Sequence, residues 1–241
     1  MQRYFASINQ NFSVCFSKED EHHILHVMRM KATDEIEVVD NSKVYLCRID
    51  QTNPLKVSVI HEIASDVEIK EDITLLFALT KGDKTDLVLQ KATELGVKKV
   101  ALITSERTVV SYDNKDIDKK IARFSKIMKE ASEQSHRVVV PELLGIFNLK
   151  NLPKEVFSDI NYVAYEKDAS KTDEMFEGLA KGKSISILVG PEGGFSEQEI
   201  DSLTKQGFIR TSLGKRILRA ETAAIYALSV LGYLLENEKA L

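Results

Sequence analysis

Between residues 36 and 63 the hydrophobic residues come in three short runs, IEVV, VYLCRI and KVSVI. The segments DNSK and QTNP between them are rich in residues that form turns. Short runs of this kind, separated by turns, are typical of strands in an antiparallel sheet. The sequence becomes strongly charged at residues 66–72 and its pattern changes after that point. We therefore expect a small β domain at residues 1–70 and a second domain at residues 71–241.

In the second domain, hydrophobic runs alternate with segments of helical periodicity. The runs that we expect to be strands lie at residues 73–79, 100–104, 138–140, 162–165, 185–190 and 208–213. Most of them are hydrophobic without alternation, as is typical of strands that helices cover on both faces. This part of the chain therefore predicts an α/β fold with a mainly parallel sheet.

Helix signals in the second domain agree with this fold. One predicted helix covers residues 87–95 and stops at Gly96, and another starts after Ser196, which forms a capping box with Glu199, and stops at Gly207. The last helix covers residues 221–236. Its segment AAIYALSVLGYLL is hydrophobic around almost the whole circumference, which favours burial of more than one face and hence a homodimer. Burial wholly within its own domain is the alternative.

A further helix is predicted over residues 117–131 and has one hydrophobic and one basic face. Residues 115–137 carry seven Lys or Arg against four acidic residues, although the whole chain has a net charge of −4. Since phosphate binding depends on Lys and Arg, any RNA-binding surface must be local, and this helix is a candidate. An ordinary solvated helix is the alternative. The hydrophobic stripe consists of Ile117, Ile121, Phe124, Met128 and Ala131.

Composition limits the other classes of protein. The only cysteines are Cys15 and Cys47, without a CxxC pair, which disfavours a disulfide framework or a zinc ribbon and favours the cytoplasm. No hydrophobic run reaches the roughly 18 residues of a membrane span, and the start has no secretion leader, so we expect no membrane. His22 and His26 share a helical face, but no Cys or carboxylate is spaced to complete a zinc site, so we also expect no metal.

Two glycine-containing loops carry the strongest functional signal. GPEGG at residues 190–194 and LGKRILRAET at residues 213–222 each follow a predicted strand and lead into a helix. Glycine lets a ligand approach the backbone closely, and parallel sheets bind ligands at the carboxyl ends of their strands. The spacing matches neither a dinucleotide-binding motif nor a P-loop. We expect one pocket formed by both loops, with tight strand-to-helix turns as the alternative.

The segments LVGPEGGFSEQEI and LGKRILRAETA resemble the signatures of the bacterial 16S ribosomal RNA uridine-N3 methyltransferases, a branch of the SPOUT superfamily. The resemblance extends to residues 22–40, 91–97, 105–110 and 130–143, and so covers nearly the whole chain. Thr108, where a serine is usual, and Met28, where a leucine is usual, are mild departures.

This resemblance implies an N-terminal PUA-like β-barrel that binds RNA and a C-terminal SPOUT α/β domain with a deep trefoil knot. It also implies a homodimer, S-adenosyl-L-methionine as the cofactor, and 16S ribosomal RNA within the small ribosomal subunit as the partner. Leu213, Ile217 and Leu218 would shield the adenine. The full set of expected cofactor-binding residues is Ala164, Tyr165, Leu188, Gly190, Pro191, Glu192, Gly193, Gly194, Leu213, Gly214, Ile217, Leu218 and Thr222.

The implied reaction requires uridine N3 to lose its proton, and the resulting anion spreads onto O2 and O4. A guanidinium can stabilise that charge, and Arg219 and Arg107 are our candidates. Glu221 is the candidate general base, with Glu192 as its alternative. The base must be unpaired or flipped, because N3 lies inside a base pair. The expected RNA-binding residues are Arg29, Lys31, Arg123, Lys126 and Arg137.

Other functions remain open at this stage. A ribose 2′-O-methyltransferase of the same superfamily is the nearest alternative, because cofactor loops do not define the acceptor atom. A non-catalytic RNA-binding assembly factor that keeps the pocket as a relic is another. The intact PEGG and LRAET motifs disfavour such a relic.

Overall fold

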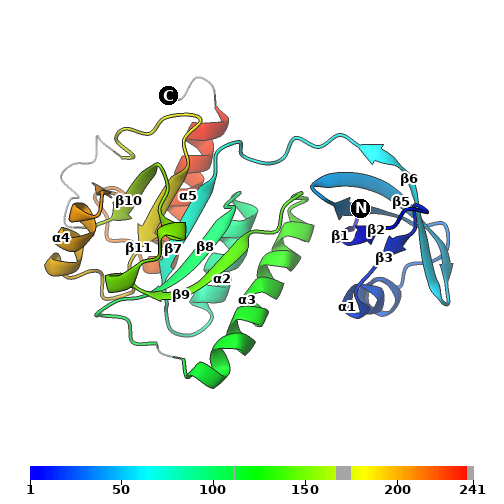
Figure 1. Ribbon diagram of the computed structural model, residues 1–241, viewed down its shortest axis with the longest axis horizontal. Helices are drawn as coiled ribbons and strands as arrows, with labels where there is room; N and C mark the ends of the chain where they lie inside the picture. The colour runs from blue at the N-terminus through cyan, green and yellow to red at the C-terminus, as the bar shows by residue number, and fades with distance from the viewer. Residues whose placement is uncertain (111, 167–174, 238–241) are drawn as a thin grey trace. The chain divides into compact units, whose positions relative to one another are not determined.

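The computed structural model describes residues 1–110, 112–166 and 175–237 (Figure 1). Contacts divide the chain into two compact units. Unit 1 comprises residues 1–68 and 132–139, and unit 2 comprises residues 69–131 and 140–241. None of the helices in the described ranges is both long and hydrophobic enough to cross a membrane.

Unit 1 is built on a sheet with the strand order β1-β4-β5-β6. The hairpins β4–β5 and β5–β6 are antiparallel, which confirms the pattern predicted for residues 36–63, whereas β1 pairs with β4 in parallel and was not predicted. The bounds are β1 Arg3–Phe5, β4 Glu35–Asp40, β5 Lys43–Thr52 and β6 Leu55–Ile63. A smaller antiparallel pair, β2 Ser7–Ile8 and β3 Val14–Cys15, precedes α1 Lys18–His22 and the π-helical turn η1 His23–Val27.

Residues 132–139 belong to unit 1 because long-range polar contacts hold them there. The Arg137 Nη2 lies 2.6 Å from the Glu68 Oε2, and the Val138 N–H donates to the other oxygen of Glu68 at 2.9 Å. Arg137 is only 3% exposed. This placement corrects the expectation that Arg137 contacts RNA, because its guanidinium is buried against a carboxylate.

Unit 2 contains a parallel sheet with the order β12-β10-β11-β7-β8-β9. This confirms the predicted parallel α/β sheet. The strand expected at residues 138–140 is wrong: residues 138 and 139 belong to unit 1, and the strand begins after Pro141. The bounds are β7 Ile73–Ala78, β8 Lys99–Thr104, β9 Glu142–Asn148, β10 Ile160–Ala164, β11 Ile185–Val189 and β12 Phe208–Thr211.

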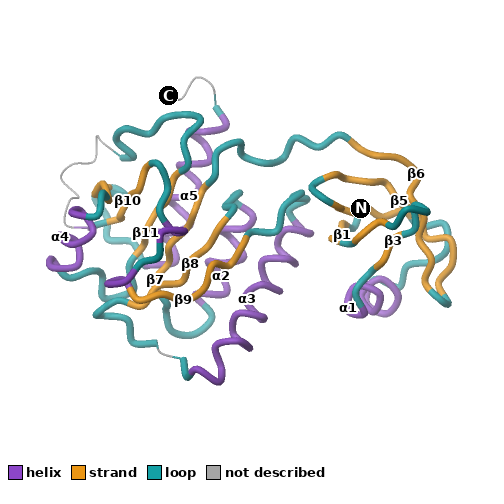
Figure 2. The backbone as a smooth tube through the Cα atoms, in the orientation of Figure 1, coloured by secondary structure: helices purple, strands orange, loops and turns teal. Residues whose placement is uncertain are grey.

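Helices cover both faces of this sheet (Figures 1 and 2). Helices α2 Lys84–Glu94, α3 Asn114–Gln134 and α5 Ala220–Glu236 bury side chains in one hydrophobic cluster, which includes Phe124, Met128 and Leu228. Helix α4 Glu197–Lys205 and the 3-10 turns η2 Leu149–Asn151 and η3 Lys154–Val156 contribute to the cluster on the opposite face. Helix α2 begins one turn earlier than predicted, and the capping box of α4 is confirmed.

The strand order determines where the candidate site lies. Strand β10 stands between β11 and β12, and all of them run parallel. Their carboxyl ends therefore share one edge of the sheet. The glycine loops that follow β11 and β12 come together at this edge, on either side of the end of β10.

Candidate functional site

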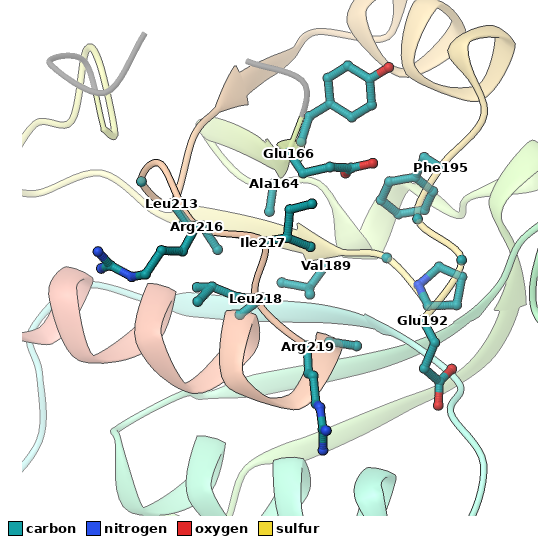
Figure 3. A pocket seen from close by; sticks show the side chains of 18 residues that line it. Ala164, Glu166, Val189, Glu192, Phe195, Leu213, Arg216, Ile217, Leu218 and Arg219 are labelled. Carbon is teal, nitrogen blue, oxygen red and sulfur yellow. The ribbon is translucent and has the colours of Figure 1, made fainter. Parts of the chain in front are cut away.

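A cavity of about 350 Å³ opens at this edge of the sheet (Figure 3). Its wall is formed by residues 164–166 after β10, residues 189–195 after β11, and the segment from Leu213 to Ala223 that enters α5. The volume lies in the range typical of small-molecule sites. The segments that sequence analysis paired from their glycines thus meet around one cavity.

The first loop is compact enough to require its glycines. Gly194 has φ +66°, and its N–H donates to the Pro191 carbonyl at 2.9 Å. A Cβ on Gly194 would lie 3.1 Å from the Glu166 Oε1, and one on Gly190 would lie 3.1 Å from the Phe195 ring. A larger residue at either position would therefore displace a side chain that lines the cavity.

The loop after β8 packs against the first glycine loop. The Arg107 Nη1 donates to the Gly193 carbonyl at 2.8 Å, and a Cβ on Gly193 would lie 3.2 Å from the Arg107 Cβ. The buried carboxylate of Glu199 joins the same two loops. One of its oxygens accepts from the Ser196 N–H at 2.9 Å and the other from the Glu106 N–H at 2.8 Å. Arg107 is thus held beside the cavity without lining it.

A lysine organises the carboxylates beside the cavity. The Lys84 Nζ lies 3.1 Å from the Glu192 Oε1 and 3.6 Å from the Glu221 Oε2. Burial acts to raise the pKa of Glu192, but hydrogen bonds from backbone amides and the ammonium of Lys84 lower it below its ordinary value. The Glu221 Oε2 is buried and, in the part of the chain that the structure describes, accepts no hydrogen bond. Glu192 is therefore a weaker base than an ordinary glutamate.

The second loop combines hydrophobic and cationic side chains. Leu213, Ile217 and Leu218 line the cavity, and Ile217 is 87% exposed. Arg216 and Arg219 also contribute to the lining. In Figure 3 the Arg219 side chain extends away from the group formed by Ile217, Glu166 and Phe195. The cavity therefore offers a hydrophobic surface at its centre and positive charge at its rim.

Family comparisons agree with this geometry. A family model described as an RNA methyltransferase domain matches residues 67–232. A second model, described as an RNA methyltransferase PUA domain, matches residues 16–60. This chain belongs to the RNA methyltransferase family. Its fold is accordingly α/β, with a PUA-like domain at the N-terminus and a parallel-sheet methyltransferase domain after it.

Individual members of the RNA methyltransferase family match over almost the full chain. Ribosomal RNA small subunit methyltransferase E of Bacillus subtilis is 37% identical, with coverage of 98% of this chain and 98% of the relative. The Neisseria gonorrhoeae protein of this name, in a crystal structure bound to S-adenosyl methionine, is 30% identical with a TM-score of 0.83 and coverage of 97% and 98%. A putative methyltransferase of Legionella pneumophila, in complex with the same cofactor, is 28% identical with a TM-score of 0.86 and coverage of 96% of each chain.

Most residues expected at the cofactor site of this RNA methyltransferase lie on the cavity wall, but Leu188 and Thr222 do not. Leu188 is buried in the cluster beneath α4, and its neighbour Val189 faces the cavity instead. Thr222 is exposed on α5. The expected residues that line the cavity are Ala164, Tyr165, Gly190, Pro191, Glu192, Gly193, Gly194, Leu213, Gly214, Ile217 and Leu218.

Some lining residues lie outside the expected cofactor set. Glu166 and Phe195 each directly follow an expected segment, so their position next to a strand end or glycine loop was the available signal. Arg216 lies between expected residues of the second loop. The other lining residues missed in this way are Val189, Ala220 and Ala223.

The expected RNA-binding residues lie in both units. Arg29 and Lys31 are exposed in unit 1, where Arg29 has φ +53°. In α3 of unit 2, the Arg123 guanidinium pairs with Asp86, and Lys126 is exposed. The predicted hydrophobic stripe of α3 is confirmed, since Phe124 and its neighbours along the stripe are buried or half-buried.

Proposed function

We propose that this chain transfers the methyl group of S-adenosylmethionine to N3 of a uridine in 16S ribosomal RNA of the small ribosomal subunit. The observation that carries the proposal is the cavity between the glycine loops, at the strand ends of a chain that matches small subunit methyltransferase E along its length. The proposal assigns RNA binding to residues 1–70, folded as a PUA-like barrel, and methyl transfer to residues 71–241.

The residues of the cavity suit this cofactor. Leu213, Ile217 and Leu218 supply a hydrophobic surface for the adenine, and the backbone of residues 190–194 supplies polar groups for its edge and the ribose. Gly190 and Gly194 line the cavity and carry no side chain that could stand between the loop backbone and a ligand. When bound, the cofactor supplies an electrophilic methyl group, and no metal ion is required.

The chain's own groups then act on the uridine. A guanidinium from Arg219 or Arg107 stabilises the negative charge that develops on the uracil carbonyl oxygens as N3 loses its proton. Glu221 is the proposed base, because its buried Oε2 accepts no hydrogen bond from the described residues. Lys84 lowers the basicity of Glu192, so Glu192 is the weaker candidate.

The wider proposal concerns RNA contacts, assembly and topology. Arg29, Lys31, Arg123 and Lys126 are proposed to contact phosphates, and the protein is proposed to act in the cytoplasm as a homodimer. A deep trefoil knot formed by the last segment of the second domain is also proposed, as the resemblance to the SPOUT superfamily implies.

Nucleoside analysis of RNA methylated in vitro tests the proposed function. Small-subunit RNA that lacks the modification is incubated with the protein and S-adenosylmethionine, digested to nucleosides, and analysed by mass spectrometry. We expect N3-methyluridine. A 2′-O-methylated nucleoside would indicate the ribose methyltransferase, and RNA binding without any methyl transfer would indicate an assembly factor.

A further inference from the structure

The turn between β2 and β3 in unit 1 places a phenylalanine in an unusual backbone conformation. Phe12 has φ +59°. Its N–H donates to the Asn9 carbonyl at 3.0 Å, and its own carbonyl accepts from the Val59 N–H at 3.1 Å. The Asn9 Oδ1 also accepts from the Ser13 N–H at 3.0 Å. These bonds on both sides hold Phe12 in its left-handed conformation.

Neither the backbone nor the packing explains a phenylalanine at this position. The left-handed region is unfavourable for a bulky residue, and glycine or asparagine normally occupies it. The Phe12 side chain is 66% exposed, so burial does not compensate for the unfavourable conformation. A residue whose backbone conformation costs stability, and whose side chain gains little from burial, points to a function for that side chain.

The surroundings indicate which partner suits an exposed ring. The residues that flank Phe12 in the turn, namely Asn9, Gln10, Asn11 and Ser13, are all polar and exposed, so the ring is an isolated aromatic surface within a polar rim. A hydrophobic protein interface would require a wider patch. An RNA base matches such a ring, because its face stacks on an aromatic side chain while its edges form hydrogen bonds.

The charge of this part of the chain favours stacking over phosphate contacts. Residues 1–68 contain seven Lys or Arg and eleven Asp or Glu. Of the basic side chains, Arg3 is buried against Glu37. Counterion release in this segment is therefore limited to local contacts such as those proposed for Arg29 and Lys31, whereas stacking of a base on an aromatic ring does not depend on charge.

We propose that Phe12 is a stacking platform for an unpaired base of the RNA substrate. This inference rests on the proposed function only in taking RNA as the partner. It assigns to the β2–β3 turn a contact that lies outside the segment matched by the PUA model, which begins at residue 16.

Two glycine substitutions distinguish the effect of the Phe12 ring from the effect of its backbone conformation. Phe12→Gly removes the ring and suits the left-handed conformation. Ser42→Gly is the matched control, because Ser42 has φ +62° in the exposed turn between β4 and β5. We expect neither variant to lower the melting temperature. We expect Phe12→Gly to weaken binding of a single-stranded, uridine-rich RNA oligonucleotide by roughly 5- to 150-fold, and Ser42→Gly to leave it unchanged.

Fluorescence provides an independent measurement of the same contact. The chain contains no tryptophan, so Phe12→Trp introduces a single indole, whose emission can be excited selectively above the absorption of the seven tyrosines. Single-stranded RNA should quench its emission, and the same strand in a duplex should quench it far less, because paired bases are not free to stack. S-adenosylmethionine alone should have no effect.

Several outcomes would overturn this proposal. One is an RNA affinity of Phe12→Gly equal to that of the wild type. Another is a lower melting temperature of Phe12→Gly than of Ser42→Gly. A third is indole emission of Phe12→Trp that changes with protein concentration and not with RNA, which would indicate contact with a second copy. Binding and quenching do not require methyl transfer. A wild-type protein that fails to methylate RNA would therefore contradict the proposed function, whereas these outcomes contradict the stacking contact alone.

Discussion

Arg219 immediately precedes helix α5, and among the described residues its guanidinium forms no ion pair. The carboxylates that could have held it, Glu192 and Glu221, lie beside Lys84 instead. A purely structural role for Arg219 would require such a partner. Its position at the rim of the cavity is therefore better explained by an anion that arrives with the substrate.

We expect Arg219→Ala to lower the rate of methyl transfer on the order of a hundredfold or more at saturating cofactor and RNA, because a preorganised donor to the developing uracil anion is lost. Arg219→Lys should restore only part of the rate, since lysine keeps the charge but loses the planar fork. Single-turnover rates measured beside the melting temperature provide the test. Arg48→Ala is the matched control, because Arg48 lies beside Asp50 on β5 of unit 1 and does not line the cavity. A near-normal rate for Arg219→Ala, or a loss fully explained by unfolding, would remove Arg219 from the mechanism.

Gly194 has a role that depends on both its conformation and its surroundings. We expect Gly194→Val to abolish measurable binding of S-adenosylmethionine, because its Cβ would crowd Glu166 at the cavity wall. Gly207→Val is the control, since Gly207 also has a positive φ, +95°, but has open space around its Cβ position and does not line the cavity. Calorimetry should find wild-type affinity in the control. Equal loss of affinity in both variants would mean that backbone strain alone, and not the cavity, accounts for the effect.

At the scale of elements, helix α4 covers the sheet and also positions the loop after β8. Its capping box uses one oxygen of Glu199, and the second oxygen accepts the Glu106 N–H from the loop after β8. Arg107 follows Glu106 and donates to the first glycine loop. Glu199 is thus a positioning residue that links the start of α4 to a candidate catalytic arginine.

We expect Glu199→Gln to leave one part-buried N–H without an acceptor, because an amide has one oxygen, and the loss of this hydrogen bond should cost about 0.5–1.5 kcal/mol of stability. Because Arg107 would then be displaced, the methyl-transfer rate of Glu199→Gln should fall well below that of Ser196→Ala. That control removes the capping hydroxyl, at a cost of about 0.5–2 kcal/mol, together with its exposed hydrogen bond to the Glu106 Oε2, but keeps both Glu199 acceptors and thus the backbone link to Glu106. The measurement is the rate at saturating substrates, well below both melting temperatures. Equal transfer rates in the two variants would mean that Glu199 only caps α4 and does not position Arg107.

Local patterns predicted the elements that depend on local chemistry. The capped helix α4, the hydrophobic stripe of α3 and the hairpins of residues 36–63 all followed from nearest-neighbour signals. The strand expected at residues 138–140 failed because a long-range contact decides its place. The hydrophobic valines look like a strand, but the bond from Val138 to Glu68 spans 70 residues of sequence and leaves no periodicity.

In the candidate site, too, local sequence predicts some features and not others. Its glycine loops were evident from composition, because few other functions need so many glycines after a strand. The choice of Leu188 over Val189 failed because every residue of β11 is buried. Alternation fixes only that neighbours face opposite sides of the sheet, and a strand that is hydrophobic on both sides does not reveal which side carries the cavity.

At the scale of the whole molecule, α5 connects the cavity to the outer surface of unit 2. Ala220 and Ala223 at its start line the cavity, while Leu228 and Leu231 are fully buried against the sheet. On the opposite side of the helix, Tyr226 is 38% exposed and Tyr233 is 63% exposed. These positions are seven residues apart and therefore lie on one helical face. Thr222, Ser229 and Glu236 are exposed on the same side of α5, so the two tyrosines form an aromatic patch between polar residues, which fits the proposed two-fold interface.

We expect the wild-type protein to be a dimer by light scattering, and Tyr226→Glu combined with Tyr233→Glu to be a monomer. Burying two carboxylates at a two-fold contact is unfavourable, and loss of an aromatic anchor typically costs about 2 kcal/mol, or roughly thirtyfold in Kd. Ile209→Glu is the matched control, because Ile209 is 37% exposed and lies on β12, the edge strand that packs beside β10 and α4. Since both tyrosines are exposed in the single chain, the double variant should keep its melting temperature at low protein concentration. A monomeric wild type, or a double variant that stays dimeric across the concentration series, would exclude this face of α5 as the interface.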